Sequence, residues 1–166
     1  MIRVALLLAV SACALFAQVK VASINRQLAV TETAEIKKAQ GEMEAKFKPR
    51  QAEVEKLQKE IASLQGQLQS GQGKLTPQAE QGIQAQGQRR QRELQRLTED
   101  LQGDVERERT EILQRVGGRM QDVVRKLAEE RALDVVVDVS NTVYFKPALD
   151  ITKEATAAYD KAYPLK

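Results

Sequence analysis

Two long stretches of helical sequence, separated by a glycine-containing turn, constrain the fold of this chain more than any other feature. From residue 36 to residue 68, apolar side chains recur at steps that are mostly three or four, the heptad spacing of a coiled coil. The positions of this seam are Ile36, Met43, Phe47, Val54, Leu57, Ile61, Leu64 and Leu68, with Arg50 as a polar intruder. We therefore expect a long helix that covers only a thin apolar stripe.

The seam stops at residues 70–76, where Gly71 and Gly73 favour a turn over continued helix. Thr76 and Pro77 then supply an N-cap residue and a proline at the first helical position, which is a signal for a new helix. Apolar residues again recur at helical spacing from residue 83 to residue 127. The sequence thus predicts an antiparallel coiled-coil arm over residues 34–131, with its tip near residues 70–76.

Two features interrupt these helices. Pro49 removes a backbone hydrogen bond and clashes with the preceding turn, so we expect a kink or a fresh helix start there. Gly117 and Gly118 lie inside the return helix and weaken it by about 2 kcal/mol relative to alanine. We expect a compensating feature at these glycines, either a close approach of another helix or a hinge between arm and body.

Short β-branched segments flank the helical region. Residues 19–25 predict a strand, and apolar residues alternate again from Leu133 to Val139. Ser140-Asn141 offers a tight turn, and residues 142–146 predict the second strand of a β-hairpin. A short amphipathic helix is expected at about residues 153–162, with Asp150 or Thr152 as its cap.

The two ends of the chain are expected to meet in one small body. A lone β-hairpin is only marginally stable in water, so the first strand must join it. The body then comprises residues 18–33 and 132–166, and the fold class is α+β: a small β-body with a long helical-hairpin arm. The side chains expected in the core of the body or of its oligomer are Val19, Val21, Ile24, Leu133, Val135, Val137, Val139, Val143 and Phe145.

Aromatic bulk is scarce, with three Tyr, three Phe and no Trp. So little bulk favours extended amphipathic helix over a large packed core. We therefore expect the chain to complete its core by self-association.

The N-terminus has the pattern of a secretory signal peptide over residues 1–17. Arg3 provides the positive region, and the apolar run from Val4 to Phe16 is too short for a bilayer span, which needs about 20 residues. We expect cleavage after Ala17, leaving Gln18 as the first mature residue. Cleavage after Ala14 also satisfies the small-residue rule.

A lipid anchor is the alternative at this end of the chain. The string Val10-Ser11-Ala12-Cys13 is similar to the signal that attaches lipid to a cysteine in bacterial lipoproteins. Residues 14–17 stay apolar after that cysteine, which favours ordinary cleavage.

The absence of two residue types narrows the chemistry. The chain has no His, and Cys13, its single cysteine, lies in the segment expected to be removed. Histidine acid–base catalysis, cysteine nucleophiles and His/Cys zinc sites are therefore excluded from the mature chain. Nearly all the carboxylates lie in helical repeats among Lys and Arg, where a solvated face is the ordinary interpretation. We expect no enzyme activity, no cofactor and no metal.

Three stretches stand out within this order of elements: Phe47-Lys48-Pro49-Arg50-Gln51-Ala52-Glu53, Leu133-Asp134-Val135-Val136-Val137-Asp138 and Leu149-Asp150-Ile151-Thr152. With these stretches, the chain resembles the Skp/OmpH family of periplasmic chaperones over essentially the whole mature length. The resemblance implies a homotrimer with a shared β-body, whose three arms surround a cavity. It also implies that this cavity holds unfolded outer-membrane proteins without ATP. The Gly- and Gln-rich arm is a departure from the family.

The distal arm carries an excess of positive charge. Its basic residues are Lys74, Arg89, Arg90, Arg92 and Arg96. Only Glu80 and Glu93 oppose them between residues 65 and 98. Such an arm would attract acidic clients and anionic lipid or lipopolysaccharide, although solvated coiled-coil positions are the simpler interpretation of each residue. Nucleic acid is not expected as a partner, because the chain has no set of aromatic side chains for stacking.

Two functions remain open. The first is a periplasmic holdase that binds unfolded outer-membrane proteins by many weak contacts along the arms. The alternative is a structural spacer or adaptor of the cell envelope that uses the same coiled coil to set a distance. The glycines near the tip and in the return helix indicate arms that bend, which favours the holdase.

Overall fold

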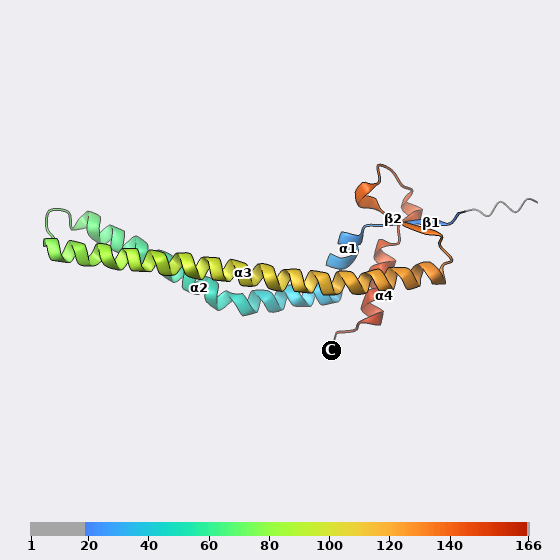
Figure 1. Ribbon diagram of the computed structural model, residues 1–166, viewed down its shortest axis with the longest axis horizontal. Helices are drawn as coiled ribbons and strands as arrows, with labels where there is room; N and C mark the ends of the chain where they lie inside the picture. Colours follow the sequence, from blue (N-terminus) through green and yellow to red (C-terminus); the bar gives the residue numbers. More distant parts are fainter. Residues whose placement is uncertain (1–18, 166) are drawn as a thin grey trace, which may run out of the picture.

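A computed structural model describes residues 19–165, which form a small body with a long helical hairpin projecting from it (Figure 1). The elements in chain order are β1 (Val21–Ile24), α1 (Arg26–Thr31), α2 (Ala34–Ser70), α3 (Pro77–Glu130), β2 (Val135–Asp138) and α4 (Thr152–Ala162). Two single 3₁₀ turns, Val139–Asn141 and Pro147–Leu149, lie between β2 and α4. Within residues 19–165, no helix is both long and apolar enough to cross a membrane.

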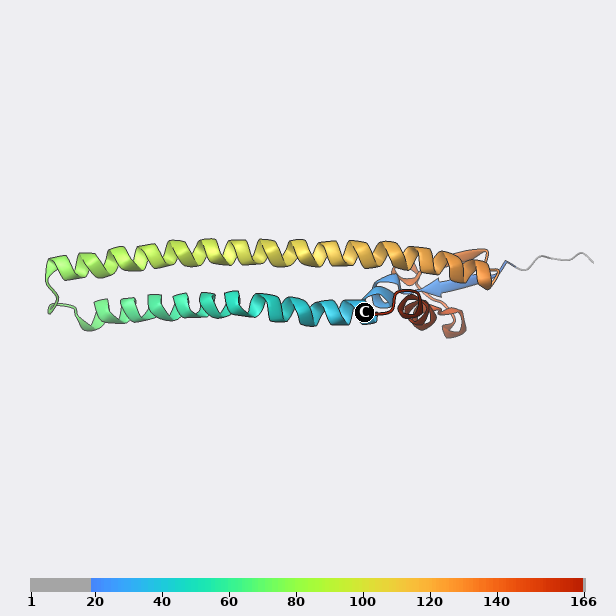
Figure 2. The same ribbon diagram turned by 90° about the horizontal axis from the view of Figure 1, so that it is seen from below.

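The arm is the antiparallel pair of α2 and α3, which run side by side along its length (Figure 2). The two helices contain 37 and 54 residues. A rise of about 1.5 Å per residue makes them roughly 55 Å and 80 Å long. The predicted seam holds them together, since Ile36, Phe47, Leu57 and Leu64 are buried. The remaining apolar seam positions of α2 are only partly covered, as expected when one thin stripe faces a single partner helix.

The turn at the tip lies where the sequence predicts it. Gly71 follows α2, and a Cβ there would lie 2.5 Å from the Leu75 side chain and 2.8 Å from the Gln67 carbonyl oxygen. Gly73 has a φ of 75°, in the left-handed region that favours glycine. The Thr76 hydroxyl accepts a hydrogen bond from the Ala79 N–H at 3.2 Å and caps α3.

At each of the two predicted interruptions, one of the two expected alternatives is wrong. The fresh helix start at Pro49 is wrong, because α2 continues through this proline as one helix. Figure 1 instead shows α2 changing direction partway along the arm. The close helix approach at Gly117 and Gly118 is also wrong, because a Cβ at either position would meet no atom within 4 Å.

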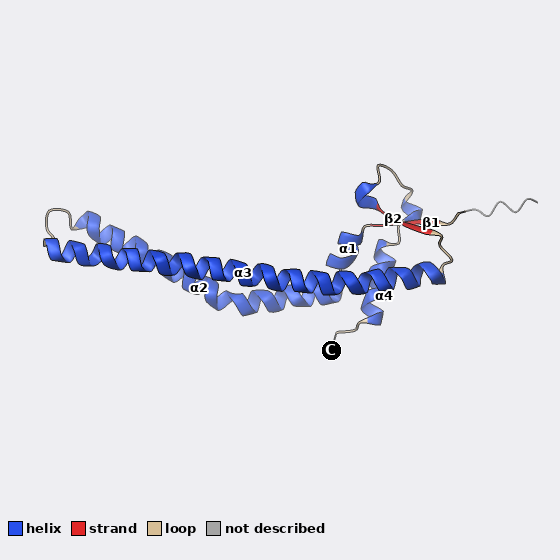
Figure 3. Cartoon of the chain, in the orientation of Figure 1, coloured by secondary structure: helices blue, strands red, loops and turns tan. Residues whose placement is uncertain are grey.

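The sheet contains two parallel strands at the base of the arm (Figure 3). Val21 pairs with Val135, and the register continues to Ile24 opposite Asp138. On its other side β1 makes one isolated bridge, from Ser23 to Asp150. The first strand therefore joins the C-terminal segment, as predicted.

The predicted β-hairpin over residues 133–146 is wrong. The Asp138 carboxylate accepts hydrogen bonds from the N–H and the hydroxyl of Ser140, which turns the chain into a 3₁₀ turn directly after β2. Residues 142–146 form no strand. Val143 is fully exposed and Tyr144 is 78% exposed, so this segment packs little against its own chain.

The core of the body lies where α1, the end of α3 and α4 meet. Its central side chains come from the last third of the return helix, where Val116 and Met120 have no exposed surface and Val123 and Leu127 are buried. The other buried members are Ala22, Ile24, Ala29, Val30, Ile36, Ile151, Ala155 and Tyr159. The long α3 thus belongs to the arm along most of its length and to the body at its end.

Candidate functional site

The sheet carries an exposed apolar surface on the side away from the core. We name this surface the sheet face and define it by its most exposed large apolar side chains. They are Val19, Val21, Val135 and Val137, with exposed fractions from 39% to 63%. β2 has no strand on its outer edge within residues 19–165. An exposed apolar patch beside an open strand edge is typical of a protein interface.

The structure divides the predicted body-core residues into two groups. Ile24 is buried in the single chain, and Leu133, Val139 and Phe145 are partly buried. Of the remaining five, Val19, Val21, Val135 and Val137 lie on the sheet face, and Val143 is fully exposed in the segment after β2. Their role as an oligomer core stays a prediction. Sequence reasoning missed Ala22 of β1 and Val136 of β2, which face the core of the chain itself. Val136 was missed because three valines in a row give β2 no polar alternation.

Glu35, in the first turn of α2, is the centre of a polar network at the root of the arm. Its carboxylate accepts a hydrogen bond from the Tyr159 hydroxyl at 2.6 Å. Arg115 and Arg119 of α3 each reach it at 3.1 Å. Arg119 also lies over the ring of Tyr163, 4.8 Å from its centre. The network thus joins α2, α3 and the C-terminal segment at one carboxylate.

The electrostatics of this network favour the ionised carboxylate. Burial raises the pKa of Glu35, but the hydrogen bonds from Tyr159 and Arg115 and the charge of Arg119 outweigh it and hold that pKa below its usual range. Burial, together with the bond to Glu35, raises the pKa of Tyr159 to about 12. Tyr159 is therefore a neutral donor at neutral pH, and the network is structural rather than reactive.

Further hydrogen bonds tie α4 to the start of the arm. The Asp160 carboxylate accepts a bond from the Ala34 N–H at 3.0 Å, at the first residue of α2. The Thr152 hydroxyl accepts from the Asn25 N–H at 2.8 Å, and the Thr156 hydroxyl donates to the Ala29 carbonyl at 3.1 Å. The body therefore fixes the position from which the arm projects.

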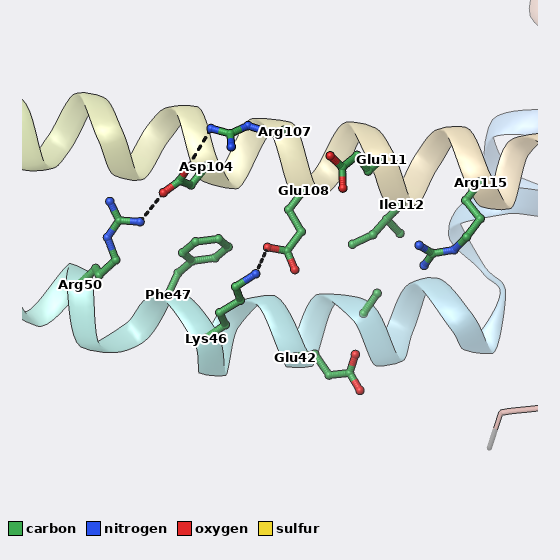
Figure 4. A pocket seen from close by; sticks show the side chains of 11 residues that line it. Glu42, Lys46, Phe47, Arg50, Asp104, Arg107, Glu108, Glu111, Ile112 and Arg115 are labelled. Atoms are coloured by element: carbon green, nitrogen blue, oxygen red, sulfur yellow. Dashed lines mark hydrogen bonds and ion pairs between the residues drawn. The ribbon is translucent and has the colours of Figure 1, made fainter.

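A second feature of the arm is a groove between α2 and α3, which we name the arm groove (Figure 4). It encloses about 710 Å³ around the ring of Phe47. Two ion pairs bridge it: Arg50 with Asp104 at 2.6 Å, and Lys46 with Glu108. The hydrogen bond from Arg50 lowers the pKa of Asp104. Each of these two carboxylates is paired with a cation of the facing helix, so the two ion pairs link α2 and α3 across the groove.

The predicted basic residues do not form one cluster. Lys74 lies in the tip turn, whereas Arg89, Arg92 and Arg96 share one face of α3 at steps of three and four. These four side chains make no ion pair within the described residues. Arg90 differs, because it bridges the two helices through Glu60 at 3.1 Å and also pairs with Glu93 at 2.7 Å.

Three predictions about the N-terminus lie outside the residues that the structure describes. They concern the signal peptide over residues 1–17, its cleavage between Ala17 and Gln18, and lipid attachment at Cys13. They stay predictions.

A long antiparallel helical hairpin on a small body of parallel strands and short helices defines an arm-bearing α+β protein. Among such proteins, the chain belongs to the OmpH-like family, because the family model described as outer membrane protein (OmpH-like) matches residues 20–159. The resemblance read from the sequence is thereby confirmed.

A solved structure has the same fold. It is a protein from Caulobacter crescentus CB15 proposed to be an outer membrane chaperone (OmpH-like), with a TM-score of 0.72. The match covers 89% of this chain and 88% of that one, at 19% sequence identity. No curated protein matches the chain.

Proposed function

We propose that this protein is an ATP-independent holdase chaperone of the periplasm that binds unfolded outer-membrane proteins and prevents their aggregation. The observation that carries the proposal is a long arm whose two helices share only a narrow apolar seam. Hydrogen bonds at its root anchor this arm to the body. Such an arm offers an extended surface for many weak contacts with an unfolded chain, which together give avidity without one strong site. Membership of the OmpH-like family supports the same function.

The working form in this proposal is a homotrimer. A two-stranded sheet is marginally stable by itself, and the sheet face leaves large apolar side chains uncovered in the single chain. Assembly through the sheet face would cover them and place three arms around one space. Residues 142–146 form no strand in the chain, and Val143 and Tyr144 are exposed there.

The distal arm supplies the electrostatic part of the proposal. Arg89, Arg92 and Arg96 share one exposed side of α3 with no internal ion pair among the described residues, and Lys74 adds a charge at the tip. These cations would attract acidic segments of a client and anionic lipid or lipopolysaccharide beside the membrane. Arg90 is engaged across the arm and takes no part.

The test is dilution of a urea-unfolded outer-membrane β-barrel into buffer, with and without residues 18–166, while light scattering reports aggregation. We expect suppression without ATP. The triple variant Arg89→Glu, Arg92→Glu, Arg96→Glu should suppress aggregation less, whereas Lys153→Glu, an exposed charge on α4, serves as the control. A folded oligomer that suppresses nothing would refute the holdase and leave the envelope spacer as the function.

A further inference from the structure

A second groove, distinct from the arm groove, lies at the root of the arm between α1, α2 and α3. We name it the root groove. It encloses about 620 Å³. Its apolar lining comes from all three helices: Val30 of α1, Ile36 and Met43 of α2, and Ile112 and Leu113 of α3. A groove of this size with an apolar lining is typical of a ligand site.

Glycines widen the root groove on its α3 side. Arg109, Leu113, Gly117 and Gln121 follow one another at steps of four, so they form a row along the helix. Gly117 leaves a gap in that row, and Gly118 lies beside it. A side chain at either glycine would meet no atom within 4 Å. The chain therefore leaves this space open although alanine would favour the helix by up to about 1 kcal/mol at each position.

The rim of the root groove carries four glutamines, which are Gln27, Gln40, Gln114 and Gln121. All four are exposed, and their side chains make no hydrogen bond within residues 19–165. A primary amide offers both donors and an acceptor. That combination matches the N–H and carbonyl groups of an extended polypeptide backbone.

The charge of the root groove is positive. Arg26 pairs with Asp138 at 3.6 Å, so these two lining charges offset each other. Arg109 makes no ion pair with any described residue. An acidic side chain next to an apolar stretch would therefore complement the groove, whereas a basic one would be repelled.

We propose that the root groove binds an extended apolar segment of an unfolded polypeptide, with a neighbouring acidic side chain against Arg109. The inference rests on the proposed holdase function and deepens it by assigning a defined client site. The apolar lining contacts the apolar side chains of the bound segment, and the glutamines form hydrogen bonds with its backbone. The gap at Gly117 leaves room for a bulky side chain of that segment. Met43 adapts the lining to different sequences, because its thioether chain is flexible.

The direct test fills the space at Gly117 and Gly118 with larger side chains. The mature oligomer with Gly117→Gln and Gly118→Gln is compared with Gly103→Gln, a glycine of the same helix that also has open space but does not line the groove. Fluorescence anisotropy with a labelled, urea-unfolded outer-membrane β-barrel gives the Kd, and thermal unfolding reports folding. We expect the double variant to bind at least fivefold more weakly, whereas Gly103→Gln binds like the wild type. Both should be at least as heat-stable as the wild type.

A charge test uses two peptides that share one apolar segment, flanked by Asp in the first and by Asn in the second. The wild type should bind the Asp peptide more tightly, and Arg109→Glu should abolish or reverse that preference. Lys153→Glu, outside the groove, should retain it. Equal binding of both peptides to the wild type contradicts the role of Arg109.

The outcomes separate this inference from the function on which it rests. A wild type that binds no unfolded barrel refutes the holdase itself. Strong binding that the filled groove leaves unchanged refutes only the client site. A change of oligomer mass in the Gly117→Gln, Gly118→Gln variant, measured by sedimentation velocity, would assign the groove to a second copy of the chain and overturn the proposal.

Discussion

At the residue scale, Glu35 is the most connected polar group of the body, because its carboxylate accepts hydrogen bonds from Tyr159, Arg115 and Arg119. The Tyr159 ring is completely buried, so its hydroxyl depends on Glu35 for a partner. Hydrogen bonds to charged groups contribute about 1.5–3 kcal/mol, and loss of a partner leaves a buried donor unsatisfied.

The first prediction compares two variants of this network. Glu35→Ala should lower the free energy of unfolding by about 2–3 kcal/mol, because Tyr159 and both arginines lose their acceptor. Tyr159→Phe keeps the buried ring and removes one bond, so it should cost about 1 kcal/mol. Urea unfolding at pH 7 measures both. Equal stability of Glu35→Ala and the wild type would contradict the central place of this carboxylate.

The second prediction concerns pH. Because the folded-state pKa of Glu35 lies below its unfolded value, ionised Glu35 stabilises the protein above the ordinary carboxyl pKa of about 4.3. This contribution is lost as the pH falls through the lower, folded-state pKa. The stability difference between the wild type and Glu35→Gln should therefore shrink from pH 7 to pH 3. A difference that stays constant would show that Glu35 does not titrate in this way.

Sequence reasoning predicted the buried positions of the arm, because the heptad places Ile36, Phe47 and Leu57 on one stripe. It did not predict the pairing of Arg90. All five basic residues look alike in the sequence, and the register of α2 against α3 decides that only Arg90 meets Glu60. Ion pairs across two helices depend on this register, which periodicity alone does not give.

At the element scale, α2 contains a proline without breaking. Phe47 and Leu57, on either side of Pro49, are both buried in the seam, and their packing favours one continuous helix. Tertiary packing thus outweighs the local preference that predicted a fresh start. The failed β-hairpin has a different, local cause, because the Asp138–Ser140 bonds form a 3₁₀ turn where the sequence predicted a tight hairpin turn.

The third prediction tests the proline. Pro49→Ala restores a backbone donor and removes the clash with the preceding turn, so it should stabilise α2 by about 1–3 kcal/mol. Hydrogen exchange should slow around residues 45–53, and not in the α3 segment of residues 77–90. Unchanged exchange at residues 45–53 would show that the proline does not destabilise α2.

The parallel pairing of β1 and β2 follows from the helical hairpin between them. α2 carries the chain away from the body and α3 returns it, so the second strand can enter beside the first in the same direction. The sequence indicates that residues 19–25 and 133–139 share a sheet. It contains no local signal for the direction in which these two segments pair.

At the scale of the whole molecule, the sheet face is a surface whose apolar side chains the single chain leaves exposed to solvent. Val137 is 39% exposed and Val135 is 46% exposed, whereas the core of the chain lies on the opposite side of the strands. These residues should therefore matter more for assembly than for the folding of one chain.

The fourth prediction follows from that difference. Val137→Asp should dissociate the proposed trimer, because a charge without a partner would be buried in its interface. Helix content by circular dichroism should remain, since the core around Met120 is untouched. Sedimentation velocity measures the assembly, and Val137→Ile is the matched control. A trimeric Val137→Asp protein would place the interface elsewhere.

Native mass spectrometry of residues 18–166 mixed with an unfolded outer-membrane β-barrel, without nucleotide, tests the proposed holdase function most directly. We expect a complex of three copies of this chain with one client, and a free protein that is also trimeric. A well-folded oligomer that forms no complex with the unfolded barrel would contradict the holdase.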